Sequence, residues 1–147
     1  MQANVKLKIN AIIQTINLRT REIKKETRVH NLVTNIGLDE VIDNGLVNIG
    51  YMGIGEDATA VTAGDTELGT EVAREAIAPT DEGTGIREYD KTFTFVSGES
   101  YTIVEAGLFN SLTASGSLML NRLTFSGHAV DVDNGVRVRI TITLTAV

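Results

Sequence analysis

The end of the chain has the most regular pattern of apolar and polar positions. Over residues 136–145, apolar Val, Ile and Leu alternate with Arg and Thr at every position. A period of two puts one set of side chains in a core and the other in water, so the pattern predicts a β-strand. Just before it, Asp133, Asn134 and Gly135 include an Asn-Gly pair that tolerates positive φ. This pair predicts a tight hairpin turn from a strand over residues 128–132.

Several other segments have strand length and are rich in β-branched and aromatic residues. They cover residues 5–9, 89–96, 100–109 and 116–125. In the first of them the apolar phase shifts near residues 11–13, and a bulge or a turn at that point would account for the shift. Ser97, Gly98 and Glu99 predict a turn between two of the strands.

One segment, residues 34–46, is predicted to be a helix. Thr34 or Asn35 is a candidate N-cap, and Gly45 is a candidate C-terminal stop. The supporting residues are the apolar Leu38, Val41 and Ile42 at helical spacing, with Asp39 and Glu40 in the early turns. A helix this short depends on packing, so we expect it to cover one end or side of a sheet.

These elements predict an all-β protein, either an antiparallel β-sandwich or a jelly-roll-like barrel, with one short helix. The 147 residues indicate one domain over residues 1–147, because a chain of this size can bury roughly 68–70% of its unfolded surface. Residues 1–28 form either a basic N-terminal arm or a strand within that domain. We find no linker and no internal repeat.

Composition narrows the classes of function. The chain has no Cys, so neither a disulfide nor a thiolate metal site is expected. No apolar run approaches the ~20 residues of a membrane helix, and the N-terminus lacks the apolar region of a signal peptide. We therefore expect no membrane partner.

Charge is distributed unevenly along the chain. The net charge is −6, but residues 1–30 contain seven Lys and Arg against two Glu, so the rest of the chain is strongly acidic. An acidic body argues against nucleic-acid binding, whereas the basic segment could dock on an acidic neighbour. Alternatively, its lysines protect a sheet edge. The candidate docking residues are Lys6, Lys8, Arg19, Arg21, Lys24, Lys25 and Arg28.

The stretch over residues 51–75 contains Gly53 and Gly55, the first two glycines of a dinucleotide fingerprint, with Ala58 in the third position. The fingerprint requires a helix directly afterwards, and the Thr- and Gly-rich sequence that follows lacks helical periodicity. No Walker loop occurs in the chain either. We therefore predict no cofactor, and we interpret Gly53, Gly55 and Gly135 as glycines at turns or at sites of close backbone packing.

The acidic residues of the same stretch resemble part of a calcium loop. Glu56, Asp57, Asp65 and Glu67 could supply oxygen ligands. Residues 131–135 also mimic the start of such a loop but lack the later bidentate Glu. We predict no metal site.

Candidate catalytic residues are also lacking. His30 and His128 lie in no triad or metal pattern and are interpreted as loop or edge-strand residues, and no G-x-S-x-G elbow occurs. We predict no catalytic residue and no enzymatic activity.

Four sequence blocks, over residues 30–41, 51–75, 101–111 and 118–144, carry a family resemblance, and two of them contain its most specific residues. One follows the Gly53-Ile54-Gly55 loop and reads D-T-x-L-G-x-E-x-x-R, at Asp65, Thr66, Leu68, Gly69, Glu71 and Arg74. The other is Glu105-Ala106-Gly107-Leu108-Phe109. In order and spacing, residues 29–145 resemble the structural proteins of tailed bacteriophages, which are often tail-fibre-like or virion decoration proteins. The chain departs from that pattern at Glu56-Asp57, where the family commonly has Gly-Thr.

The resemblance implies a non-enzymatic virion component, assembled in the host bacterial cytoplasm as a homo-oligomer, with a trimer favoured. Its other partners would be virion proteins such as the major capsid protein or tail proteins. Because no fibrous shaft follows, a capsid decoration (cement) protein is slightly favoured over a tail, collar or baseplate fibre or adaptor. The alternative of another class is a carbohydrate-binding receptor module, although the chain has no Trp on which a sugar could stack.

One charged residue stands inside an apolar run. Glu105 lies in the strand predicted over residues 100–109, where a carboxylate is costly without a partner. Arg74 is the one cation of residues 29–86. We therefore predict that Arg74 and Glu105 pair across strands and fix their register.

Overall fold

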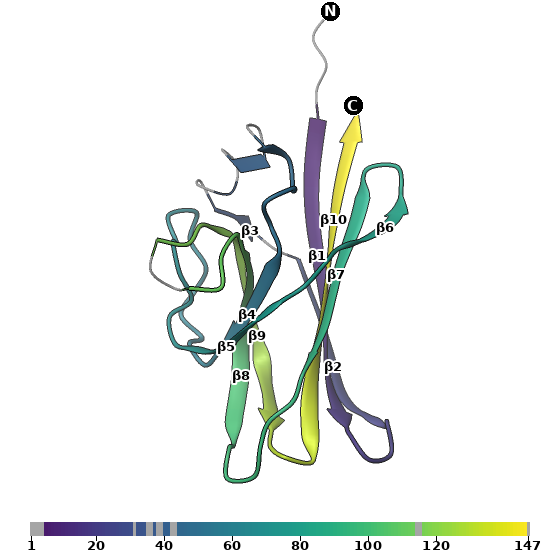
Figure 1. Ribbon diagram of the computed structural model, residues 1–147, viewed down its shortest axis with the longest axis vertical. Helices are drawn as coiled ribbons and strands as arrows, with labels where there is room; N and C mark the ends of the chain where they lie inside the picture. Colours follow the sequence, from purple (N-terminus) through teal and green to yellow (C-terminus); the bar gives the residue numbers. More distant parts are fainter. Residues whose placement is uncertain are drawn as a thin grey trace, which may run out of the picture.

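The computed structural model describes residues 5–30, 32–34, 37, 40–41, 44–113 and 116–146. Within these residues the chain forms ten β-strands in two five-stranded antiparallel sheets. The sheets face each other as a β-sandwich and are not closed into a barrel (Figure 1). Of the two predicted architectures, the sandwich is therefore confirmed.

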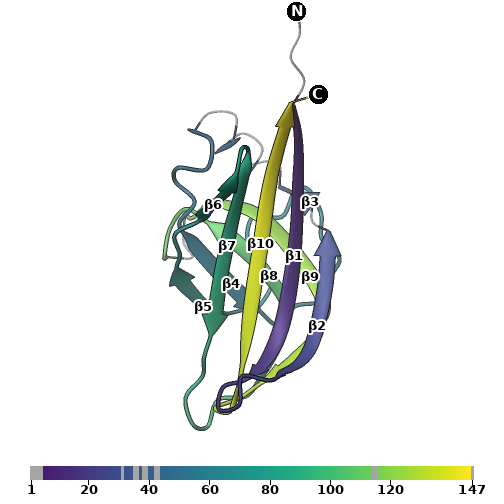
Figure 2. The same cartoon turned by 90° about the vertical axis from the view of Figure 1, so that its right-hand side faces the viewer.

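Sheet A has the strand order β2-β1-β10-β7-β6 (Figure 2). Its strands are β1 (Val5–Asn17), β2 (Ile23–His30), β6 (Thr80–Gly83), β7 (Ile86–Phe93) and β10 (Asn134–Ala146). The first and last strands, β1 and β10, pair along their whole length. The strand predicted over residues 136–145 is confirmed.

The predicted irregularity near residues 11–13 is wrong. β1 pairs with β10 without a register shift, and Ala11 and Ile13 continue the buried face that begins at Ile9. Ile12 caused the error because it points to the other, partly exposed face. The register shift in β1 occurs later, against β2 at Thr15 and Ile16.

Sheet B has the strand order β3-β9-β8-β4-β5. Its strands are β3 (Leu32–Val33), β4 (Tyr51–Gly55), β5 (Glu71–Ala76), β8 (Tyr101–Phe109) and β9 (Met119–Val130). β4 lies between β5 and β8, and it pairs with both of them.

The predicted hairpin before the last strand is wrong, because β9 and β10 belong to different sheets. The turn between them is held by Asp131, whose Oδ1 accepts the backbone N–H groups of Asp133 and Asn134, each at 2.9 Å. Gly135 lies in β10 and does not have a positive φ. A Cβ at Gly135 would lie 2.7 Å from the carbonyl oxygen of Phe93, so close packing explains this glycine.

The predicted turn at residues 97–99 is confirmed. Gly98 has a φ of 92°, and the N–H of Glu99 donates to the carbonyl of Val96 at 3.1 Å. This turn also connects the two sheets, since it joins β7 to β8.

The predicted helix is present where the structure describes it, at positions 37, 40, 41 and 44. Thr34 is its N-cap, because the Thr34 hydroxyl oxygen accepts the N–H of Gly37 at 2.9 Å. At the other end, Gly45 has a φ of 66° and donates its N–H to Val41 at 3.0 Å. The predictions for Asn35, Leu38, Asp39 and Ile42 lie outside the described residues.

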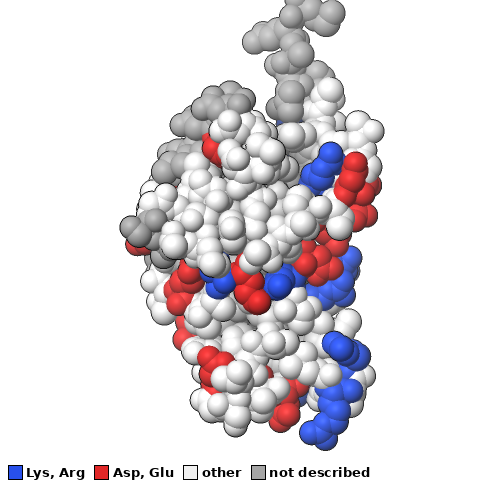
Figure 3. Space-filling model, viewed as in Figure 1, with Lys and Arg blue, Asp and Glu red and all other residues white. Residues whose placement is uncertain are grey.

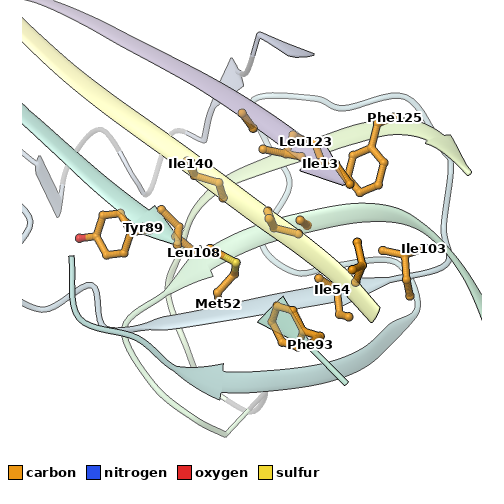
Figure 4. Packing of buried hydrophobic residues seen from close by; sticks show 14 of the residues in the cluster. Ile13, Met52, Ile54, Tyr89, Phe93, Ile103, Leu108, Leu123, Phe125 and Ile140 are labelled. Carbon is orange, nitrogen blue, oxygen red and sulfur yellow. The ribbon is translucent and has the colours of Figure 1, made fainter. Parts of the chain in front are cut away.

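The core lies between the inner faces of the two sheets (Figure 4). Its fully buried members include Ile13, Met52, Ile54, Phe93, Ile103, Leu108, Leu123 and Ile140. Burying each side chain of this size contributes about 1.5–3 kcal/mol. Tyr89 is also buried, and its hydroxyl donates to the carbonyl of Ile49 at 3.2 Å. Burial raises the pKa of Tyr89 to about 12.

Candidate functional site

The connection between β4 and β5, residues 56–70, covers the outer face of sheet B, and we call it the capping loop (Figure 1). Leu68 of this loop is 5% exposed and packs with Phe109 and Met119, while Tyr51 is packed against the cluster. The capping loop thereby forms a second, small apolar core outside the sandwich. Most of the family-like sequence of residues 51–75 lies in this loop and the two strands beside it.

Glycines make the surface under the capping loop flat. Gly53 and Gly107 lie opposite each other on β4 and β8, and Arg74 and Arg122 flank them in the same row. A Cβ at Gly53 would lie 2.9 Å from the Phe109 ring, and one at Gly107 would lie 2.6 Å from the Asn121 carbonyl oxygen. These positions therefore have no room for a side chain.

Gly55, at the end of β4, is equally confined, since a Cβ there would collide with the Thr70 carbonyl oxygen and with the Glu105 carboxylate. Neither Gly53 nor Gly55 has a positive φ. The structure thus corrects their description as turn glycines: both are strand residues, and close packing is what requires them.

Glu105 on β8 is the anchor of the capping loop. Its carboxylate is completely buried and accepts three backbone N–H groups, from Asp57 at 3.0 Å, Gly69 at 2.9 Å and Thr70 at 2.8 Å. These donors come from the two ends of the loop. The Nε of Arg122 donates to the same carboxylate at 3.0 Å. The costly buried charge is therefore fully hydrogen-bonded.

Arg122 on β9 holds the middle of the loop. Its guanidinium donates to the carbonyls of Asp57 and Thr59, each at 3.0 Å, and to Oδ2 of Asp65 at 3.2 Å. Burial alone would lower the pKa of Arg122, but the hydrogen bonds to Glu105 and Asp65 raise it above its usual value. The side chain is 4% exposed and remains charged.

The two aspartates of the loop each close a local turn. Asp57 accepts both the N–H and the hydroxyl of Thr59, and these bonds lower the pKa of Asp57. Asp65 does the same for Thr62; burial opposes the shift, but the hydrogen bonds from Thr62 and Arg122 outweigh it and lower the pKa of Asp65.

The predicted pair between Arg74 and Glu105 is wrong. Glu105 pairs with Arg122, while Arg74 pairs with Glu71 at 2.6 Å. The reason is the strand order: β4 separates the two residues, and Arg74 lies in the row of Gly53, which leaves room for its side chain to reach Phe109. The guanidinium carbon stands 3.5 Å from the centre of the Phe109 ring, a cation–π contact.

Arg74 also holds a second loop. Its Nη1 donates to the carbonyls of Ser111 and Thr113, at 3.0 and 3.3 Å, and to the hydroxyl of Ser117 at 3.0 Å. The segment between β8 and β9 is thereby fixed to β5. Arg74 thus fastens a loop, a role that the sequence did not predict.

The two histidines lie in different environments. His30 is exposed on β2, with Nδ1 2.6 Å from Oδ1 of Asn10. His128 on β9 is fully buried, which sequence reasoning missed; its ring nitrogens bond the hydroxyls of Thr15 and Thr27 at 2.8 and 2.9 Å. His128 therefore links sheet B to β1 and β2 of sheet A. Burial lowers the pKa of His128 to about 4, and the nearby Lys25 charge acts in the same direction.

The predicted docking residues all lie in β1, in β2 or in the turn between them. Lys25 donates to the carbonyl of Gly127 on β9 at 2.6 Å, so it helps to close this side of the sandwich. Lys6, Lys8, Lys24 and Arg28 are exposed. Residues 5–28 of the segment are thus strands and turn of sheet A.

The described contacts of this site fasten loops. Among the described residues, no group of three or more His, Asp or Glu side chains could hold a metal ion. The loop carboxylates Asp57 and Asp65 are engaged by Thr59, Thr62 and Arg122. The arrangement can present a rigid, acidic loop on the outside of sheet B.

Arg122 and His128 are the structural residues that sequence reasoning missed. Arg122 stands in an apolar run, residues 118–125, just as Glu105 stands in another. The same argument that singled out Glu105 could have paired two buried opposite charges. Nothing in the local sequence distinguishes His128 from an exposed strand residue.

Comparisons with protein families, curated proteins and solved structures found no match to this chain. In the described part of the chain, no helix has the length and apolar character needed to cross a membrane.

Proposed function

We propose that this protein is a non-enzymatic structural component of a tailed-phage virion, which works by binding copies of itself and neighbouring virion proteins. The observation that carries the proposal is the structural role of the residues that resemble the phage family. Asp65, Leu68, Gly69, Arg74 and Glu105 are all engaged in fastening the capping loop or the loop beside it. Family-like residues that serve this purpose support a rigid building block.

Within the virion, a capsid decoration protein remains our slightly favoured role, and a tail, collar or baseplate adaptor is the alternative. Copy number separates them, because a shell presents many equivalent sites while a tail ring presents only a few. Particles of the phage that encodes this chain should be purified and the chain quantified by mass spectrometry with isotope-labelled peptides. Hundreds of copies support decoration, and the number of one ring supports the tail role.

Gold-labelled antibody against the chain should locate it on the same particles by electron microscopy. Label over the head supports decoration, and label at the tail or neck supports the adaptor. If purified particles contain none of the chain, the proposed function is wrong.

The carbohydrate-binding alternative is disfavoured by the aromatic residues. Sugar rings stack on exposed aromatic faces, and this chain has three Tyr and four Phe. Each of the four Phe side chains is at most 9% exposed, Tyr89 is buried, and Tyr51 and Tyr101 are partly buried. No exposed aromatic platform is therefore present.

A further inference from the structure

The two narrow sides of the sandwich carry opposite charge. One side, the basic side, is formed by β1 and β2, and its residues 5–30 contain seven Lys and Arg against two Glu. The other, the acidic side, is formed by β5 and β6, and its residues 71–83 contain four carboxylates against one Arg. Arg87 and Lys91 of the neighbouring β7 pair with Asp81 and Glu75, and Arg74 pairs with Glu71, so Glu82 is the carboxylate of this side for which no ion pair is described. Figure 2 shows β2 at one side of the molecule and β5 and β6 at the other.

The space-filling view agrees with this division. In Figure 3, Asp and Glu side chains are spread over the region where Figure 1 places β5 and β6. Lys and Arg gather at the lower right, where Figure 1 places β2 and the turn before it. Figure 3 also shows Lys and Arg side chains among the Asp and Glu side chains above this corner, and the acidic side spans the edges of both sheets, because β5 belongs to sheet B. The basic and acidic sides still lie on opposite sides of the sandwich, which gives a second copy a complementary surface.

The strand edges on the two sides also have complementary steps. β2 pairs with β1 only from Asn10 to Ile16, so residues 5–9 of β1 have no described neighbour on that side. On the other side of the sheet, β6 pairs only with residues 86–88 of β7. Residues 89–93 of β7 therefore have no described sheet-A neighbour on the side away from β10. Each sheet edge thus has one covered and one open part.

The register places these steps at heights that match to within one row, since β6 reaches the row of Asn10, which β2 already occupies. Through β10, residues 86–88 of β7 lie in the rows of residues 8–10 of β1, and residues 89–93 lie in the rows of residues 11–15. In two copies set side by side, β6 of one copy would face the open edge of β1 in the other. β2 would face the open edge of β7. Ile23 on β2 is an apolar side chain that is half-exposed in one copy, and this contact would cover it.

Charged edge strands ordinarily keep copies of a protein apart. That protection works when the edges that could meet carry like charges. Here the edges that could meet carry an excess of opposite charges, so this protection does not act between them.

We propose that the basic side of one copy binds the acidic side of a second copy, so that sheet A continues from subunit to subunit. This inference rests on the self-association in the proposed function and names its surface. The contact is head-to-tail, so it generates a closed ring if the rotation between subunits closes. Lys8 of one copy then lies in the row of Gly83 of the next copy, beside Glu82.

Charge reversal on each side tests the contact. One variant carries Lys8→Glu with Lys24→Glu, and the other carries Glu75→Lys with Glu82→Lys; all four residues lie outside the buried network. In sedimentation velocity at low salt, the unmodified chain should assemble. Each variant should sediment as a monomer, with an assembly midpoint at least tenfold higher in concentration. An equimolar mixture should assemble again, because the reversed side of each variant now complements the other.

Glu67→Lys on the capping loop is the control. It replaces Glu by Lys, as the second variant does, at a position on neither the basic nor the acidic side, so this variant should assemble normally. Circular dichroism shows that each variant is folded. The inference is overturned if the unmodified chain is monomeric at every concentration, if folded variants assemble unchanged, or if the mixture does not recover. These results leave the proposed function standing on the particle experiment, which fails independently if the chain is absent from particles.

Discussion

The outer faces of the two sheets use charge in opposite ways. On sheet B, Glu105 and Arg122 are buried at 0% and 4% exposure beneath the capping loop. On sheet A no described loop covers the charges, and Arg137 pairs with Asp90 at 2.6 Å while both side chains remain about a third exposed. Both faces thus contain an Arg–carboxylate pair, but only one of the pairs is removed from water.

The difference shows why an Arg–carboxylate pair has a different effect on the structure when it is buried and when it is exposed. A buried ion pair is costly to form, and it persists here because Glu105 also accepts three backbone N–H groups of the loop. An exposed pair is screened by water and salt and contributes little. The pair on sheet B therefore determines where a loop lies, while the pair on sheet A is part of a polar surface.

The largest expected effect comes from Glu105→Gln. The change leaves Arg122 buried without its main counter-charge, so it should lower the free energy of unfolding by about 3–5 kcal/mol. Urea unfolding measures the loss, and limited proteolysis should then cut within residues 56–70. A loss no greater than that of an exposed pair would contradict the view that Glu105 anchors the loop.

A second prediction extends the comparison to the space between the sheets. The folded-state pKa of His128, about 4, lies below its ordinary value of 6.5. Between these two pH values, His128 binds a proton in the unfolded chain but not in the folded chain. Stability contributed by neutral His128 is complete above pH 6.5 and is lost as the pH falls toward 4, by on the order of 3 kcal/mol.

Melting curves between pH 7 and pH 4 measure this slope. His128→Gln removes the titrating ring, and it should flatten the dependence on pH in that window. Aspartates such as Asp57 and Asp65, whose pKa values are lowered, lose their contribution at lower pH. An unchanged slope in the His128→Gln variant would show that other groups cause it.

Two glycines, one packed beneath the capping loop and one exposed within it, form a matched pair for substitution. Gly55→Ala places a methyl group against the Thr70 carbonyl and the Glu105 carboxylate, and it should cost about 1–3 kcal/mol. Gly64, within the loop, has open space around it, so Gly64→Ala should be neutral or slightly stabilising. Thermal unfolding of the two variants compares them, and equal costs would argue against a closely packed floor.

The smallest effect is expected on sheet A. Asp90→Asn removes the charge that Arg137 contacts, but both groups are partly hydrated, so the cost should be about 1 kcal/mol or less. The same urea measurement serves as the matched counterpart to Glu105→Gln. A large loss at Asp90 would remove the contrast between the two faces.

The sequence predicted the class of fold well, because alternation reports directly on which face of a strand is buried. The strand over residues 136–145, the turn at Gly98 and the short helix capped by Thr34 all depend on local patterns. Strand partners are not local. The turn after β9 looked like a hairpin because Asn-Gly is a common hairpin turn, yet each flanking strand packs its apolar face from a different sheet.

The candidate site was predictable only in part. Glu105 stood out because a carboxylate within an apolar run needs a partner. Arg74 was chosen because it is the one Lys or Arg in residues 29–86. Its position in the sequence does not reveal that β4 lies between β5 and β8. Arg122 became the partner through the pairing of β8 with β9, and this pairing is a property of the whole fold.

The pairing of β1 with β10 has a consequence for biosynthesis. β10 is made after every other described strand, yet it occupies the middle of sheet A, between β1 and β7. While the ribosome is still extending the chain, those two strands have no bridge between them, and sheet A cannot close. Completion therefore waits for a contact between residues more than a hundred positions apart, a topology that slows folding and exposes the nascent chain to aggregation.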